Sequence, residues 1–208
     1  MNKTKSRILD ASRQLFNKKG FSDVTIRMIA AELSMSSGNL NYHYKKREDI
    51  LEALYFEMVE VFDKRVEDLG NKPISLIMVK EDVISSLKRM IDYRFFWTDL
   101  YNLLRLNHKI KEHFLKVYDE RKNGTRYLFE VLQSMNLMNE FKFNKESDFL
   151  IERMITYSNT WLYNSFIYDV EINEKYVESH AEKLIGMLYP YFTEKGKNQF
   201  KALFPELF

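Results

Sequence analysis

Apolar residues recur along most of the chain every three or four positions, which is the spacing of one buried face on an amphipathic helix. The pattern is clearest over residues 3–19, where one face carries Ile8, Ala11, Leu15 and Phe16. Proline and glycine are sparse, and no run alternates between apolar and polar residues over the length of a strand. The sequence therefore predicts an all-α protein.

Interruptions of this pattern separate the predicted helices. Gly20 is well placed as the left-handed residue that ends the first helix, and Thr25 as the N-cap of the second. The further helices that we expect span about 26–33, 39–44, 47–69, 75–92, 96–107, 109–136, 146–168 and 173–192, with a short one before Pro205.

Residues 25–50 contain the most informative local pattern. Apolar residues at the helical spacing i, i+3, i+4 and i+7 are followed by serines and a glycine, which favour turns and caps over helix interiors. The next short helix, 39–44, buries Leu40 and Tyr44 and directs polar side chains outward. Two short helices joined by a tight turn predict a DNA-binding helix-turn-helix.

Charge is divided unevenly between the two ends of the chain. Residues 1–47 contain ten Lys and Arg against three acids, a net charge of +7, whereas the other 161 residues have a net charge of −5. A basic head on an acidic body indicates a polyanionic partner at one end only. Charge alone would also fit a solvated helix face, but together with the helix-turn-helix pattern it favours DNA.

Composition excludes several other classes. An apolar content of 45% over 208 residues indicates a globular protein, and the absence of cysteine excludes disulfides and thiolate metal sites. No stretch approaches about 18 uninterrupted apolar residues, and the charged N-terminus is no signal peptide, so we expect a cytoplasmic protein without a membrane partner. The four histidines have no metal-binding spacing and no glycine loop could cradle a phosphate, so we expect neither an enzyme nor a cofactor or metal.

Three consecutive motifs carry a resemblance to a known family: IL-ASRQLF-KKGF, then T-I-x-x-IA, then S-x-G-N-L-x-YHY-K-x-R-E-D-I-L. Their order and spacing resemble the DNA-binding domain of the TetR family of bacterial transcriptional regulators, over about a quarter of the chain. The resemblance implies a three-helix DNA-binding domain at residues 1–47 and a larger helical domain for effector binding and dimerisation at residues 48–208.

The chain departs from the family pattern at three positions. Ser34 stands where the turn often has glycine, so the turn is made without a permissive backbone. Met28 stands where an acid often completes a capping box with Thr25. Asn41 stands where the family frequently has an aromatic residue, which predicts a different base preference.

The resemblance implies that the 39–44 helix enters the major groove, where Asn39 and Asn41 read base edges. Backbone amides near Ser37 and Gly38 suit a phosphate, and a clamp on the DNA backbone is expected from Thr25, Tyr42, Lys45 and Arg47. Tyr42 has the alternative of being a core aromatic. The complete predicted DNA-binding set is Thr25, Ser36, Ser37, Gly38, Asn39, Asn41, Tyr42, His43, Lys45, Lys46 and Arg47.

The resemblance also implies a homodimer and a small-molecule effector, apolar or aromatic. Apolar stripes on the last two long helices are candidates for the dimer interface, with an internal core as the alternative: Ile155, Leu162, Phe166, Val177, Leu184 and Leu188. Aromatic residues interspersed with arginines are candidates for the effector site, although any single aromatic residue at helical spacing is more often part of the core: Phe96, Trp97, Tyr101, Arg105, Tyr118, Arg121, Tyr157 and Trp161.

These expectations combine into a ligand-responsive repressor that binds a near-palindromic operator as a homodimer and is released by a small molecule. Two alternatives stay open at this point. One is an activator of the same fold, and the other is a helical interaction protein with a vestigial helix-turn-helix.

Overall fold

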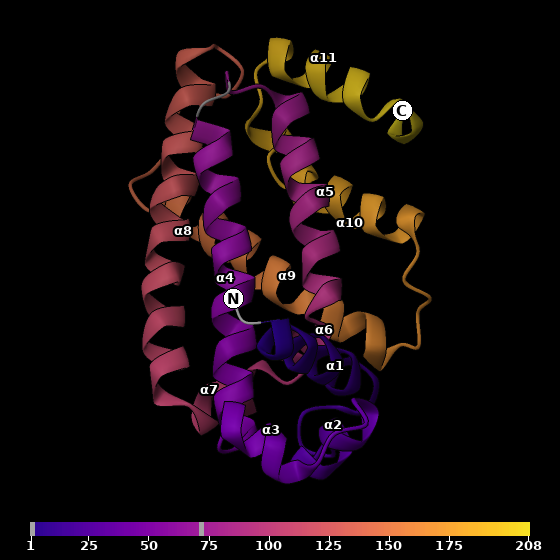
Figure 1. Ribbon diagram of the computed structural model, residues 1–208. Helices are drawn as coiled ribbons and strands as arrows, with labels where there is room; N and C mark the ends of the chain where they lie inside the picture. Colours follow the sequence, from indigo (N-terminus) through magenta and orange to yellow (C-terminus); the bar gives the residue numbers. More distant parts are fainter. Residues whose placement is uncertain (1–2, 71–72) are drawn as a thin grey trace. The chain divides into compact units, whose positions relative to one another are not determined.

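The computed structural model describes residues 3–70 and 73–208, with the side chains of residues 65–70 outside that description. Within these residues every regular element is a helix, apart from one isolated bridge between Met138 and Phe192 (Figure 1). The all-α prediction is therefore confirmed. The elements are α1 (Lys3–Lys19), α2 (Ile26–Glu32), α3 (Ser37–His43), α4 (Arg47–Gly70), α5 (Leu76–Asp92), α6 (Arg94–Thr98), α7 (Leu100–Leu106), α8 (His108–Ser134), α9 (Glu146–Ile167), α10 (Glu174–Gly186), η1 (Tyr189–Tyr191), α11 (Glu194–Leu203) and η2 (Pro205–Leu207).

The end of α1 and the N-cap of α2 are formed by the residues predicted from the sequence. α1 has the expected bounds, and Gly20 after it is left-handed with φ of +81°. The hydroxyl of Thr25 accepts a hydrogen bond from the Met28 amide at 3.3 Å, which makes Thr25 the N-cap of α2. Both predictions are confirmed.

Two predicted helices differ in the structure. The helix expected over 96–107 is split into α6 and α7, because the backbone leaves the helical conformation at Asp99 (φ −126°, ψ 25°). The helix expected over 173–192 ends at Gly186 and gives way to the short η1, which contains Pro190. A proline cannot donate the backbone hydrogen bond that an α-helix would need there.

The chain forms two compact units. The first contains residues 1–71 and 92–113, and the second contains residues 72–91 and 114–208. The first unit extends past residue 47 because the end of α1 is bound to the start of α6. The amide of Asn17 donates to the Asp92 carbonyl at 2.8 Å and its oxygen accepts from the Phe95 amide at 3.1 Å. The functional boundary at residue 47 stays a prediction.

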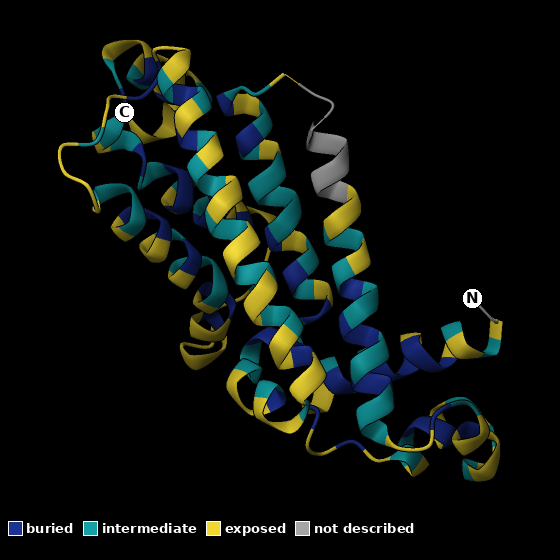
Figure 2. Cartoon of the chain, turned by 90° about the vertical axis from the view of Figure 1, so that its left-hand side faces the viewer, coloured by how far each residue is buried: buried dark blue, intermediate teal, exposed yellow. Residues whose placement is uncertain are grey.

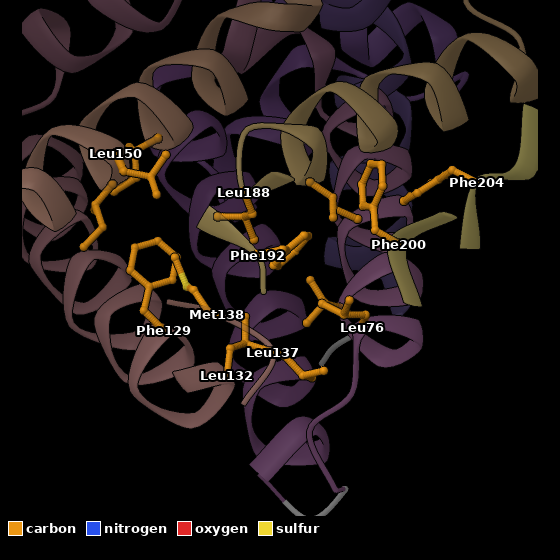
Figure 3. Packing of buried hydrophobic residues seen from close by; sticks show 14 residues of the cluster. Leu76, Phe129, Leu132, Leu137, Met138, Leu150, Leu188, Phe192, Phe200 and Phe204 are labelled. Carbon is orange, nitrogen blue, oxygen red and sulfur yellow. The ribbon is translucent and has the colours of Figure 1, made fainter. Parts of the chain in front are cut away.

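The second unit has its own apolar core (Figure 3). The labelled side chains come from α5, α8, the turn after α8, α9 and the C-terminal segment: Leu76, Phe129, Leu132, Leu137, Met138, Leu150, Leu188, Phe192, Phe200 and Phe204. Figure 2 shows the resulting pattern along the long helices, which are buried on one side and exposed on the other. In the described part of the chain, no helix is long and apolar enough to cross a membrane.

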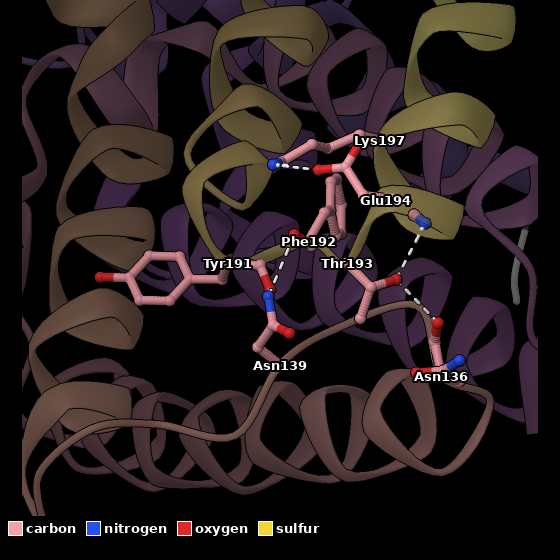
Figure 4. A network of polar contacts seen from close by, with 8 residues as sticks. Asn136, Asn139, Tyr191, Phe192, Thr193, Glu194 and Lys197 are labelled. Atoms are coloured by element: carbon pink, nitrogen blue, oxygen red, sulfur yellow. Dashed lines mark hydrogen bonds and ion pairs between the residues drawn. The ribbon is translucent and has the colours of Figure 1, made fainter.

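Polar contacts hold the C-terminal segment of the second unit to the turn after α8 (Figure 4). The hydroxyl of Thr193 donates to the Asn136 carbonyl at 2.8 Å and accepts from the backbone amide of Gly196 at 3.1 Å. The side-chain Nδ2 of Asn139 donates to the Tyr191 carbonyl at 3.1 Å. Gly196 is packed so closely that an added Cβ would lie 2.1 Å from the carbonyl oxygen of Leu137. Glycine is therefore required at this position by the fold itself.

Candidate nucleic-acid interface

The short helix α3 is anchored to the rest of the first unit by two side chains. Leu40 is fully buried and Tyr44 nearly so, and the Lys5 ammonium lies 5.6 Å from the centre of the Tyr44 ring. Their assignment to the core is confirmed. Burial of these two residues fixes which face of the short helix points away from the protein.

The turn between α2 and α3 is made by a serine in a glycine-like conformation. Ser34 has φ of +53°, and the amides of Ser34 and Met35 donate to the carbonyls of Ala31 and Ala30 at 3.0 and 2.9 Å. These bonds satisfy carbonyls that the end of α2 would otherwise leave unpaired. Ser36 then caps α3, since its hydroxyl accepts from the Asn39 amide at 3.1 Å. This cap explains why α3 begins at Ser37, two residues before the predicted start.

The outward face of α3 carries polar and aromatic side chains. Asn39 and Asn41 are exposed, and Tyr42 is 85% exposed, so its alternative role as a core aromatic is wrong. His43 is half-buried, with its ring 5.3 Å from that of Tyr42. The structure thus places amide donors and acceptors, a phenol and an imidazole on one short helix.

The other predicted DNA-binding residues lie within α3 or close to it in the sequence. Lys45 and Lys46 are exposed next to its end, and Gly38 is exposed near its start. Ser37 is half-buried, while Thr25 and Ser36 are exposed but use their hydroxyls as N-caps. Figure 1 shows α2 and α3 next to each other at the end of the first unit, in keeping with their direct packing.

Arg47 was expected in the clamp on the DNA backbone, and here the structure gives a different role. Its Nη1 donates to the backbone carbonyls of Phe21, Ser22 and Val24 at 2.9, 2.9 and 2.8 Å, and its guanidinium lies 4.1 Å from the centre of the Phe21 ring. The three bonds direct both hydrogens of Nη1 into the protein and give Arg47 an internal role. A DNA contact by Arg47 stays a prediction.

The predicted effector residues are divided between the two units. In the first unit, Phe96 and Trp97 are buried, whereas Tyr101 and Arg105 are exposed with the guanidinium 5.6 Å from the Tyr101 ring centre. Tyr101 and Arg105 are therefore surface residues in the single chain. The other four, Tyr118, Arg121, Tyr157 and Trp161, lie in the second unit.

The four second-unit residues have polar or aromatic partners. Arg121 donates to the Asn159 amide oxygen at 2.9 Å and to the Ser158 hydroxyl at 2.7 Å. The Tyr157 hydroxyl is hydrogen-bonded to Nδ1 of His180 at 2.5 Å, and the Trp161 ring lies 5.0 Å from the His180 ring. Tyr118 is half-buried beneath the Lys122 ammonium, 4.7 Å from its ring centre.

His180 is the residue in this group that sequence reasoning missed. It is 6% exposed, and burial, aided by the nearby Lys183 charge, lowers the pKa of its imidazole to about 4. Burial also raises the pKa of the Tyr157 hydroxyl. One feature of the sequence could have indicated its burial: His180 follows Val177 by three residues and therefore lies on the apolar stripe of α10.

The predicted dimer residues need correction. Of the six, Ile155, Leu162, Val177, Leu184 and Leu188 are buried within the single chain, and Phe166 alone is exposed. Each of these five residues has at most 8% of its surface exposed and offers little area to a second copy. The five buried residues therefore belong to the internal core, which was the stated alternative.

Two protein-family models match this chain. Residues 8–54 match a model described as "Bacterial regulatory proteins, tetR family", and residues 62–200 match one described as "Bacterial transcriptional repressor". The chain belongs to the TetR family. It is a DNA-binding transcriptional regulator, because that is what this family consists of, and it is not an enzyme.

Curated TetR-family relatives include two regulators from Bacillus subtilis strain 168. The uncharacterized HTH-type transcriptional regulator YerO is 34% identical over 123 residues, covering 56% of this chain and 42% of YerO. The probable regulator YttP is 28% identical over 91 residues, covering 44% of each protein. The matched segments thus span less than half the length of these relatives.

Solved structures share the fold over nearly the whole chain. A TetR-family regulator from Marinobacter aquaeolei VT8 superposes with a TM-score of 0.88 at 22% identity, covering 98% of both chains. A putative transcriptional regulator from Saccharomonospora viridis, solved in complex with choline, gives a TM-score of 0.72 at 19% identity and covers 93% of this chain and 100% of that one.

Proposed function

We propose that this TetR-family protein binds a near-palindromic operator as a homodimer, represses transcription there and is released by a small molecule. The observation that carries the proposal is the anchored recognition helix. Leu40 and Tyr44 fix α3 in the first unit and leave Asn39, Asn41 and Tyr42 exposed. Because the partner is chromosomal DNA, we place the protein in the cytoplasm.

The two asparagines are the proposed base readers. An asparagine amide can donate to N7 and accept from N6 of adenine in a bidentate pair, and the major groove presents a distinct pattern for each base pair. Lys45, Lys46 and Tyr42 are the proposed phosphate contacts, since they are exposed beside α3. Phosphate contacts fix the register of a protein on DNA, whereas base contacts carry the sequence information.

Asn41→Ala tests the base-reading role. Selection of bound duplexes from a random pool gives the operator, and titrations over single-base variants then give the preference at each position. The substitution should relax the preference at one base pair, at a cost of about 1–3 kcal/mol. Lys45→Ala is the control and should weaken all duplexes about equally. A uniform loss for Asn41→Ala would contradict its role as a base reader.

Dimerisation is proposed through the outward face at the end of α9. Tyr163, Phe166 and Ile167 lie at helical spacing on this face and are 47%, 47% and 52% exposed. An exposed apolar patch of this kind marks an interaction surface, and a two-fold interface would pair the same patch on both copies. Two recognition helices would then read half-sites about 34–36 Å apart.

Sedimentation analysis tests this face with Phe166→Glu, with Phe149→Glu as a matched control. Phe149 is 50% exposed in the first turn of the same helix, about five turns from Phe166. The proposal predicts monomers for Phe166→Glu and dimers for the control. Dimers for both variants would place the interface elsewhere.

The effector is proposed to be an apolar or aromatic small molecule that binds the second unit near Tyr118, Arg121, Tyr157 and Trp161. A structure of the same fold with choline bound supports small-molecule binding by this architecture. Native mass spectrometry of protein purified from its host, followed by operator binding with and without the extracted molecule, tests this. A reporter gene behind the operator distinguishes repression from activation.

A further inference from the structure

Arg47, the first residue of α4, is bound to the turn between α1 and α2. Its Nη1 shares its two hydrogens among the carbonyl oxygens of Phe21, Ser22 and Val24, and its guanidinium covers the face of the Phe21 ring. We refer to residues 21–24 as the entry turn, because Thr25, the N-cap of α2, follows it directly. The side chain therefore joins the start of α4 to the residues that lead into the helix-turn-helix.

The entry turn is itself firmly packed. Phe21 is 2% exposed and its ring lies 5.1 Å from that of Phe16, while Val24 is fully buried. Nη2 of Arg47 lies 3.7 Å from Oε1 of Glu48, so part of the arginine charge is compensated within the protein. The arginine, which follows α3 at the start of α4, is thus bound to the entry turn that precedes α2.

We propose that Arg47 is a positioning residue for DNA recognition, which sets the place of α2 and α3 relative to α4 through the entry turn and contacts no phosphate. Nη1 makes all three carbonyl bonds while the planar guanidinium lies over the Phe21 ring, whereas a lysine is a point charge on a flexible stem and cannot stack on a ring in this way. Arg47→Lys therefore retains the charge and removes the geometry. The inference rests on the operator binding proposed above.

The test compares Arg47→Lys and Arg47→Ala with Lys45→Ala, whose exposed side chain has the same charge two residues earlier. Binding is measured for the duplex selected from a random pool and for an unrelated duplex, each over a series of salt concentrations. For Arg47→Lys we expect operator affinity to fall about tenfold, the loss associated with one hydrogen bond to a charged group. Affinity for the unrelated duplex and the salt dependence should stay unchanged.

Lys45→Ala should behave differently, because it removes a phosphate contact. Both duplexes should bind more weakly, and the slope of log K against log salt should fall by about 0.9. If Arg47→Lys binds like the wild type and Arg47→Ala reproduces the Lys45→Ala pattern, Arg47 is a phosphate clamp and the proposal is wrong. If both Arg47 variants melt at lower temperature but bind the operator normally when folded, its role is in stability alone, which also overturns the proposal.

Amide hydrogen exchange provides a readout without DNA. The Met28 amide, which is bonded to Thr25, should exchange faster in Arg47→Lys than in the wild type, because α2 loses its fixed start. Unchanged exchange there would overturn the proposal whatever the DNA results. If the wild type enriches no duplex from the pool, the operator proposal fails, and that failure is separate from the exchange result.

Discussion

Gly38 offers a direct test of how closely DNA approaches α3. It is the second residue of α3, it is exposed, and its backbone lies outside the left-handed region. A Cβ added there would meet one atom within 4 Å, the Ser36 hydroxyl oxygen at 3.9 Å, which is an ordinary van der Waals contact. The fold therefore does not require glycine at this position, in contrast to Gly196.

The expected effects of Gly38→Ala on stability and on binding have opposite signs. Alanine is favoured over glycine inside a helix by about 0.5–1 kcal/mol, so the free protein should be as stable as the wild type or slightly more so. If a DNA phosphate packs against the Gly38 backbone, the added methyl group holds α3 away from the groove. Loss of one good base contact costs about 1–3 kcal/mol, which corresponds to about a 5- to 150-fold loss of operator affinity.

Urea unfolding and operator titration measure the two effects separately. Gly124→Ala is the matched control, because Gly124 is also an exposed helical glycine and a Cβ there would meet nothing within 4 Å. The control should gain similar stability and bind the operator normally. Full operator affinity in Gly38→Ala would refute the reasoning, since it would show that DNA leaves room for a side chain at this point.

Three further substitutions test the structure itself. Ser34→Gly should stabilise the protein by about 1 kcal/mol in urea unfolding, because a left-handed backbone costs an L-residue about 1–2 kcal/mol; a loss would mean that the serine side chain contributes more than the strain costs. Gly196→Ala should lower the free energy of unfolding by about 3 kcal/mol, because the new Cβ collides with the Leu137 carbonyl; an unchanged midpoint would contradict this packing. The imidazole of His180 has a pKa of about 4 in the folded protein and of about 6.5 in the unfolded chain, so the unfolded chain takes up a proton first as the pH falls. Stability should therefore fall by up to about 3 kcal/mol between pH 6.5 and 4, and His180→Gln should abolish that part of the fall; the same fall in the variant would assign it to other groups.

The sequence predicted local structure well wherever one residue decides it. Gly20 and Thr25 end α1 and start α2 as expected, and the unusual backbone of Ser34 follows from a serine in a position that suits glycine. The split at Asp99 was not predicted, because the apolar spacing continues across it and neither proline nor glycine marks it. Apolar periodicity shows which face of a helix is buried and does not report a break in its backbone.

The candidate sites show where sequence reasoning reaches its limit. An apolar stripe on a helix has the same appearance whether it faces the core or another subunit, and five of the six predicted dimer residues face the core. Likewise, an arginine at the start of α4 reads as a phosphate contact until its three carbonyl partners are seen. His180 was missed because one histidine on an apolar stripe carries no motif. Each of these depends on contacts between distant parts of the chain.

The composition of the first unit bears on how far this protein is modular. Residues 92–113 belong to that unit, and they supply the Asp92 carbonyl and Phe95 amide to Asn17 and the His113 imidazole to the Tyr55 hydroxyl, 3.0 Å away. A fragment cut after residue 71 would lose all of these partners and uncover the apolar surface of Phe16 that packs on Phe95. Chimeras that exchange DNA specificity between relatives would therefore have to transplant two separate stretches of sequence together.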